Sequence, residues 1–335
     1  MRIPYFLLFV LTACSDVPAD SDSGLATTLP TNTPTTTSTG GTTSTTTTSS
    51  TSTTSTTAVD CNAIPQGPVV GTGLLGLFPA EDFAFDDLGN LISHHENALF
   101  QQTYPPVTAT AFAATPGGPG GPASLRRLHD GDYVNANVDT ATLYRISASG
   151  VSTPLNSALG YPGGIDIHAT GAIFLTDLIG LMRIDPVSGD TDFLLPGDTF
   201  SGANGLTFSA DYSLMYVGTR DGVMAVSVDA DGTPTADPYL FAESPMGGEL
   251  LGMGVDACDN VYALWNGEVL IRWPVTGGAS EVLFTAPAGA WLSNLQWGSG
   301  VGGWDAHSIY ITDRQIGGGG YYEVPVGVPA KPMIP

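Results

Sequence analysis

The feature that most constrains the fold is a unit that recurs six times after residue 61. Each copy has an apolar run of strand length, a polar turn containing Gly, Asp or Asn, and a second apolar run. Equivalent turns lie roughly 40–47 residues apart, which is the length of a four-stranded propeller blade. The copies are centred on residues 81–92, 124–134, 163–174, 204–217, 251–262 and 293–311.

These strand-length runs alternate with turn signals and show no helical period. The sequence therefore predicts an all-β fold, a six-bladed β-propeller over residues 61–335. The innermost strands of a propeller surround a central channel. Residues at the start of each inner strand are accordingly expected to line one mouth of that channel.

Charge narrows the possible partners. The chain of 335 residues has 32 Asp and Glu against 9 Lys and Arg, a formal net charge of -23. So few cations cannot neutralise a phosphate backbone, which excludes nucleic-acid binding. The same balance disfavours electrostatic docking on anionic lipid. The hydrophobic share of 42% is enough to build a large core. Separately, we expect the protein to be a monomer.

The first residues indicate export. Arg2 is followed by a short apolar run that ends in Leu11-Thr12-Ala13-Cys14, which resembles the lipobox of bacterial lipoproteins. We therefore expect a signal peptide over residues 1–13 and a lipid on Cys14. The alternative is an ordinary cleaved signal with an incidental cysteine. Because Ser15 rather than Asp follows the cysteine, we expect an outer-membrane lipoprotein of the cell envelope, exposed at the surface.

A tether separates this anchor from the repeats. Residues 35–57 contain only Thr, Ser and two Gly. Such a segment has no apolar groups to offset the entropy of ordering. Residues 14–60 are therefore predicted to be a disordered Ser/Thr-rich linker.

Two cysteines remain besides Cys14. In an oxidising compartment Cys61 and Cys258 form an even pair, and we expect a disulfide between them. Two unpaired thiols are the alternative. The disulfide would fix the start of the folded region to a turn far along the chain.

The predicted channel mouth carries polar side chains from several repeats. Counting back from the strand hydrophobes gives a ring of Glu81, Ser124, Gly163, Asn204, Leu251 and Ser293, with Asp82 and Asn294 adjacent. A carboxylate and a carboxamide that converge on one axis suit Ca²⁺ or another divalent cation. We name Glu81 and Asn204 as candidate ligands. The alternative is a polar mouth filled with water.

Three segments resemble the regucalcin/gluconolactonase family, whose pattern NHL-type propellers partly share: residues 81–86, 204–209 and 252–256. The resemblance implies a six-bladed propeller with a divalent metal in its channel, which serves lactone hydrolysis. Glu81 matches that family's Glu and Asn204 its central Asn. Gly163 stands where a second Asn is expected, and Leu251 stands where the family has the Asp that also acts as base.

This incomplete ligand set favours a binding or scaffold module that presents its channel mouth to a protein or carbohydrate partner. The alternative is a divalent-metal-dependent hydrolase of sugar lactones or related esters. The sequence leaves open whether the chain is an enzyme.

Overall fold

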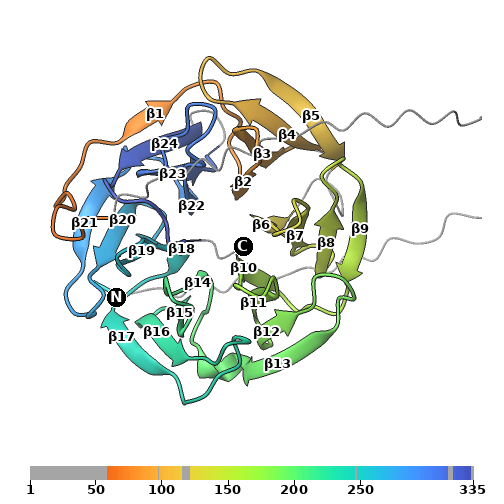
Figure 1. Cartoon of the computed structure of the whole chain (residues 1–335), viewed down its shortest axis with the longest axis vertical. Helices are drawn as coiled ribbons and strands as arrows, with labels where there is room; N and C mark the ends of the chain where they lie inside the picture. The colour runs from red at the N-terminus through yellow and green to blue at the C-terminus, as the bar shows by residue number, and fades with distance from the viewer. Residues whose placement is uncertain (1–58, 97, 115–120, 246, 316–319, 333–335) are drawn as a thin grey trace, which may run out of the picture. The chain divides into compact units, whose positions relative to one another are not determined.

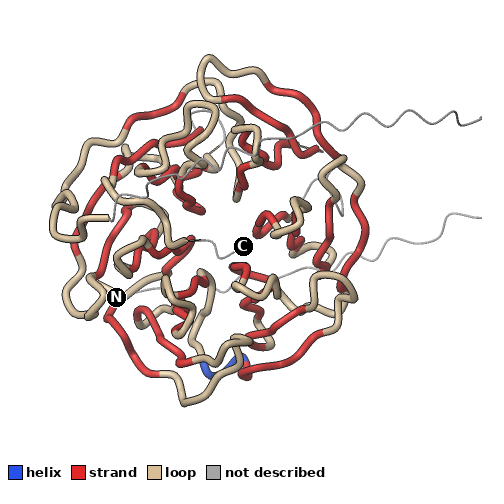
Figure 2. Tube along the Cα trace, in the orientation of Figure 1, coloured by secondary structure: helices blue, strands red, loops and turns tan. Residues whose placement is uncertain are grey.

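A computed structural model describes residues 59–96, 98–114, 121–245, 247–315 and 320–332. Within these ranges, six four-stranded sheets are arranged around a common axis (Figure 1), which confirms the predicted six-bladed β-propeller. The helical part of the described chain is one short 3-10 turn at Gly197–Thr199 (Figure 2). No helix in these ranges could span a bilayer. The predicted signal peptide, Cys14 and the tether up to residue 58 lie outside the described residues.

Blades 1 to 5 are antiparallel meanders, and blade 6 is an antiparallel sheet completed by the N-terminal strand β1; neighbouring strands in each blade are hydrogen-bonded. Blade 1 contains β2 (Phe83–Phe85), β3 (Asn90–His95), β4 (Ala98–Thr103) and β5 (Ala109–Ala114); blade 2 contains β6 (Pro122–Arg127), β7 (Tyr133–Asn137), β8 (Thr142–Ile146) and β9 (Ser152–Asn156); blade 3 contains β10 (Pro162–Ile167), β11 (Ile173–Asp177), β12 (Gly180–Ile184) and β13 (Thr191–Pro196). Blade 4 contains β14 (Leu206–Phe208), β15 (Leu214–Gly218), β16 (Gly222–Ser227) and β17 (Tyr239–Glu243); blade 5 contains β18 (Leu250–Val255), β19 (Val261–Trp265), β20 (Val269–Trp273) and β21 (Glu281–Thr285); blade 6 contains β22 (Leu292–Trp297), β23 (Ser308–Asp313), β24 (Gly320–Pro325) and β1 (Thr72–Leu74).

The polar turn of the repeat joins the first two strands of a blade. In blade 5 the Asp256 carboxylate accepts hydrogen bonds from the backbone N–H of Cys258 at 2.8 Å and of Asn260 at 2.9 Å. Asp86 binds the amides of Leu88 and Asn90 in the same way in blade 1. An Asp that binds amides two and four residues ahead stabilises a tight reversal. This is why Asp, Gly and Asn mark each repeat.

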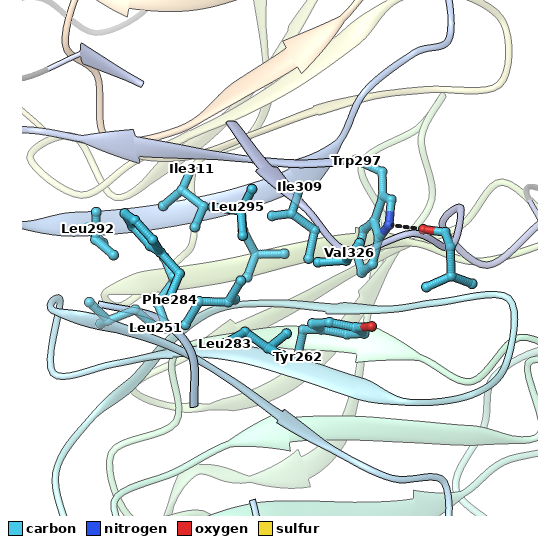
Figure 3. Packing of buried hydrophobic residues seen from close by; sticks show 14 residues of the cluster. Leu251, Tyr262, Leu283, Phe284, Leu292, Leu295, Trp297, Ile309, Ile311 and Val326 are labelled. Atoms are coloured by element: carbon cyan, nitrogen blue, oxygen red, sulfur yellow. Dashed lines mark hydrogen bonds between the residues drawn. The ribbon is translucent and has the colours of Figure 1, made fainter. Parts of the chain in front are cut away.

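Apolar side chains fill the spaces between blades, with one buried cluster at each of the six blade interfaces. Figure 3 shows the cluster between blades 5 and 6, where Tyr262 and Leu283 face Leu295 and Ile309. Because both faces of a blade are covered, inner and middle strands such as β19 are buried on both sides. A core of this kind requires the complete ring.

The two ends of the described chain close the ring. The N-terminal strand β1 pairs with β24 and forms the outer edge of blade 6. Ahead of it, Cys61 is bonded to Cys258 with a Cα–Cα distance of 5.7 Å, which confirms the predicted disulfide. After β24, the chain runs back toward the axis, where Ala330 forms a bridge with Asp256. We call residues 326–332 the C-terminal strap.

Candidate functional site

The site lies in the central channel. We define its upper mouth as the end where the inner strands begin and its lower mouth as the end where they finish. Side chains alternate along a strand, so every second residue points to the axis. On β6, Leu125 is buried in the core between blades 1 and 2, whereas Ser124 and Arg126 line the channel.

A narrow cavity near the upper mouth brings together most of the predicted ring. Its volume is about 20 Å³, enough for about one water molecule. Among the residues that line it are Glu81, Ser124, Asn204, Leu251, Ser293 and Asn294.

Two other members of the predicted set lie elsewhere. Gly163 does not line the cavity; its carbonyl accepts a hydrogen bond from Ser124 Oγ at 2.7 Å, and Gly164 lines the cavity instead. The Asp82 side chain is buried between the inner strands of blades 1 and 2. Its carboxylate accepts bonds from the backbone N–H of Phe83 at 2.7 Å and of Leu125 at 2.8 Å.

A guanidinium group crosses the channel at this level. Arg126 Nη1 donates to Asp82 Oδ2 at 2.6 Å, and Nη2 donates to Asn294 Oδ1 at 3.4 Å. The Asp82 side chain is 2% exposed and that of Arg126 is 12% exposed. Arg126 lines both the narrow cavity and a larger one below it. It therefore lies between the two cavities, together with Leu206 and Met253, which also line both.

Burial is the main influence on the pKa of the Asp82 carboxyl group. Loss of hydration raises the pKa of its carboxyl group to about 6, although Arg126 and the two backbone amides act in the opposite direction. The pair is therefore ionised at neutral pH and loses its negative partner in mildly acidic solution.

These residues do not fit a divalent cation. The Glu81 carboxylate is already engaged by Arg314 Nη1 at 2.7 Å, and the same cavity contains the positive Arg126. Calcium takes six to eight oxygen ligands, and the cavity has room for about one water molecule. No group of three or more His, Cys, Asp or Glu suited to a metal occurs within the described ranges. Glu81 and Asn204 thus line one cavity, and their assignment as metal ligands stays a prediction.

The larger cavity opens at the lower mouth and has a volume of about 430 Å³. Its walls come from all six blades and include the apolar side chains of Phe85, Leu206, Met253, Val255, Leu295 and Trp297. At its rim, Asp87 and Val301 are exposed. The cavity therefore has an apolar interior and access from solvent.

The C-terminal strap supplies one wall of this cavity. The backbone N–H of Lys331 donates to the Val255 carbonyl at 2.9 Å, and its ammonium group forms an ion pair with Asp166. The same ammonium contacts Thr207 Oγ1 at 3.3 Å and the Phe208 carbonyl at 3.2 Å. Burial lowers the pKa of Lys331, with Asp166 opposing this and the charge of Arg126 adding to it.

Sequence reasoning did not identify Arg126, Asp166 or Lys331. Arg126 and Asp166 could have been found by alternation, since each lies two residues after a channel-lining position, Ser124 or Gly164. Lys331 follows the last repeat, and no periodic signal points to it. Its position depends on a strap that forms only when the ring is closed.

The fold is shared with known propellers. No protein-family model and no curated protein matches the chain. Among solved structures, gluconolactonase from Xanthomonas campestris is 17% identical with a TM-score of 0.60, over 79% of this chain and 98% of that one. The calcium-binding protein regucalcin from Agrobacterium tumefaciens is 19% identical with a TM-score of 0.59, over 79% and 95%.

A chain of a nidogen/laminin complex is 17% identical with a TM-score of 0.54, over 67% of this chain and 85% of that one. The gluconolactonase and regucalcin structures confirm the predicted distant resemblance to that group of propellers. At these identities the likeness shows the fold alone.

Proposed function

We propose that the chain is a binding module, without metal-dependent hydrolysis, that holds a small ligand in the lower half of its channel. The observation that carries this proposal is the guanidinium of Arg126, which is fixed by Asp82 at the level of the predicted metal ligands. A cation held there disfavours a second cation by repulsion. Lactone hydrolysis of the predicted kind needs that metal and a base near it.

The lower cavity supports the binding role. A volume of about 430 Å³ lies in the range of small-molecule sites, which combine mostly apolar walls with a few placed polar groups. The nidogen/laminin neighbour belongs to a complex, so a similar fold also occurs in an assembly. A protein or carbohydrate partner on the outer loops is compatible with a ligand in the channel.

We further propose that the module is displayed on the cell envelope by a lipid on Cys14. The lipobox-like Leu11-Thr12-Ala13-Cys14 and the Thr/Ser-rich segment after it support this proposal. An anchor followed by a flexible linker would let a soluble propeller sample the space above a membrane.

Metal titration tests the proposed function. The thermal midpoint of the full chain should stay unchanged in 5 mM Ca²⁺, Mg²⁺, Mn²⁺ or Zn²⁺, and sugar lactones should not be hydrolysed. A calcium site with a dissociation constant of about 10⁻⁴–10⁻³ M would instead stabilise the protein by about 1–2 kcal/mol at this concentration.

Glu81→Gln provides the matched control, because it removes the candidate carboxylate ligand at the cavity. If calcium raises the midpoint of the wild type and Glu81→Gln abolishes that rise, the channel holds a metal. The hydrolase alternative then replaces the binding module.

A further inference from the structure

The lower cavity has a polar end and apolar walls, and the polar end decides which ligand fits. This step rests on the proposed function, that is, on a channel that binds a small molecule. The cavity lies at the mouth opposite to the predicted metal ligands, and Arg126 is shared between the two cavities. Six charged residues line the lower cavity. Asp87 pairs with Arg127, and Asp86 accepts from the amides of its own turn. The other three are Arg126, Asp166 and Lys331.

Two of these groups, Asp166 and Lys331, are already paired with each other. The three N–H bonds of the Lys331 ammonium match its three acceptors: Asp166, Thr207 and the Phe208 carbonyl. Asp166 Oδ1 accepts from the Ile167 amide, and Oδ2 accepts from Lys331, Thr207 Oγ1 and the Phe208 amide. This ion pair holds the strap in place and occupies Asp166 Oδ2, whereas Oδ1 accepts from the Ile167 amide alone within the described part of the chain.

Arg126 differs, because it has five N–H bonds and fewer acceptors. Nη1 donates to Asp82 Oδ2 and to the Leu125 carbonyl, and Nη2 donates once, to Asn294. Among the described residues, the Nε–H and the second Nη2–H have no partner. Because Arg126 lines the lower cavity, a cation with donors left over is available there to a ligand that supplies an acceptor.

We propose that the lower cavity binds a small monocarboxylate with an apolar body, whose carboxylate accepts hydrogen bonds from Arg126. The body would lie against Phe85, Met253 and Trp297, and water would reach the ligand only past the exposed rim. Bonds between a guanidinium and a carboxylate are charge-assisted and about twice as strong as neutral ones. The negative net charge of the chain disfavours ligands with several negative charges.

Calorimetric titration of the full chain in detergent-free buffer tests this assignment with three probes that share one body: phenylbutyrate, phenylbutanol and phenylbutylamine. Phenylbutyrate should bind at least about tenfold more tightly than phenylbutanol, a ratio that corresponds to about 1.4 kcal/mol. Phenylbutylamine should bind most weakly, because its ammonium group faces Arg126.

Variants locate the site. Arg126→Gln should weaken phenylbutyrate binding about tenfold and change phenylbutanol binding less than about twofold. Arg183→Gln is the matched control, because Arg183 pairs with Asp192, lies outside the cavity and should have no effect. Ala330→Phe adds a ring to a strap residue that lines the cavity and should weaken both probes.

Equal binding of the carboxylate and the alcohol, an unchanged affinity in Arg126→Gln, or no binding of any probe would each overturn the assignment. These outcomes leave the metal titration unaffected, and only that titration decides between binding module and metal hydrolase. Binding of all three probes alike, abolished by Ala330→Phe, would keep the binding module and reject the carboxylate.

Discussion

At the scale of single residues, Arg126 is the side chain that most changes the charge of the channel. Arg126 brings a positive charge to a place where Glu81, Asn204 and Asn294 would otherwise present only oxygen ligands. Its guanidinium can stay buried because Asp82 pairs with it and because the Leu125 carbonyl and Asn294 accept from it. Buried charges persist in proteins when they are paired and hydrogen-bonded in this manner.

The raised pKa of Asp82 predicts a pH effect on stability. Between its ordinary value of 3.8 and its folded value of about 6, the folded protein binds a proton that the unfolded chain does not. Stability from this group therefore falls as the pH rises through that window and is constant above it. Relative to Asp82→Asn, the wild type should lose up to about 3 kcal/mol of unfolding free energy between pH 4 and pH 7.

Urea unfolding at pH intervals measures this difference, and Asp185→Asn is the control. Amide hydrogen bonds from Ser188 and Val187 lower the pKa of Asp185, so its stabilisation is present above the unfolded value and is lost as the pH falls. The two variants should therefore change the pH profile in opposite directions. Parallel profiles for wild type and Asp82→Asn would contradict the raised pKa.

At the scale of strands, the sequence repeats correctly predicted the six blades. Bulges in the inner strands made it harder to predict which residues line the channel. The register of strand pairing is interrupted near the upper mouth in four inner strands, β6, β10, β18 and β22. A bulge changes which residues of a strand face the axis. The sequence prediction took the residue a fixed number of positions before the first apolar residue of each inner strand, and this rule therefore selected axis-facing residues in some blades and neighbouring residues in others. Gly163 and Gly164 exchange roles for this reason. That rule took one residue from each inner strand, so it missed Arg126 and Asp166, which lie further along their strands.

The disulfide joins two elements that are far apart in the chain. Cys61 precedes the closing strand β1, and Cys258 lies in the first turn of blade 5, 197 residues away. A cross-link over so long a loop restricts the unfolded chain strongly. Replacing both cysteines by Ser should lower the unfolding free energy by about 2–4 kcal/mol in denaturant titrations.

Reductant provides the control for this prediction. It should destabilise the wild type to the level of the Cys61→Ser/Cys258→Ser variant and leave the variant unchanged. Equal stability of the oxidised wild type and the variant would show that the strand pairing of β1 closes the ring without help from the disulfide.

At the scale of the whole molecule, the net charge and the proposed lipid anchor act in opposite directions on attachment to a membrane. The chain has a net charge of -23, which disfavours electrostatic attraction to anionic lipid headgroups. Stable association with a membrane therefore has to come from covalent lipid, which contributes about 0.8 kcal/mol for each buried CH₂ group.

This opposition predicts the outcome of a single substitution. Cys14→Ser removes the proposed site of lipid attachment and leaves the sequence of the described residues unchanged, so the protein should move from the membrane fraction to the soluble fraction. Fractionation of cells at low and high salt measures this. Salt should have no effect on the wild type, because lipid insertion is not screened, whereas electrostatic docking is. If Cys14→Ser stayed with the membrane until salt released it, a charged surface rather than a lipid would be the attachment.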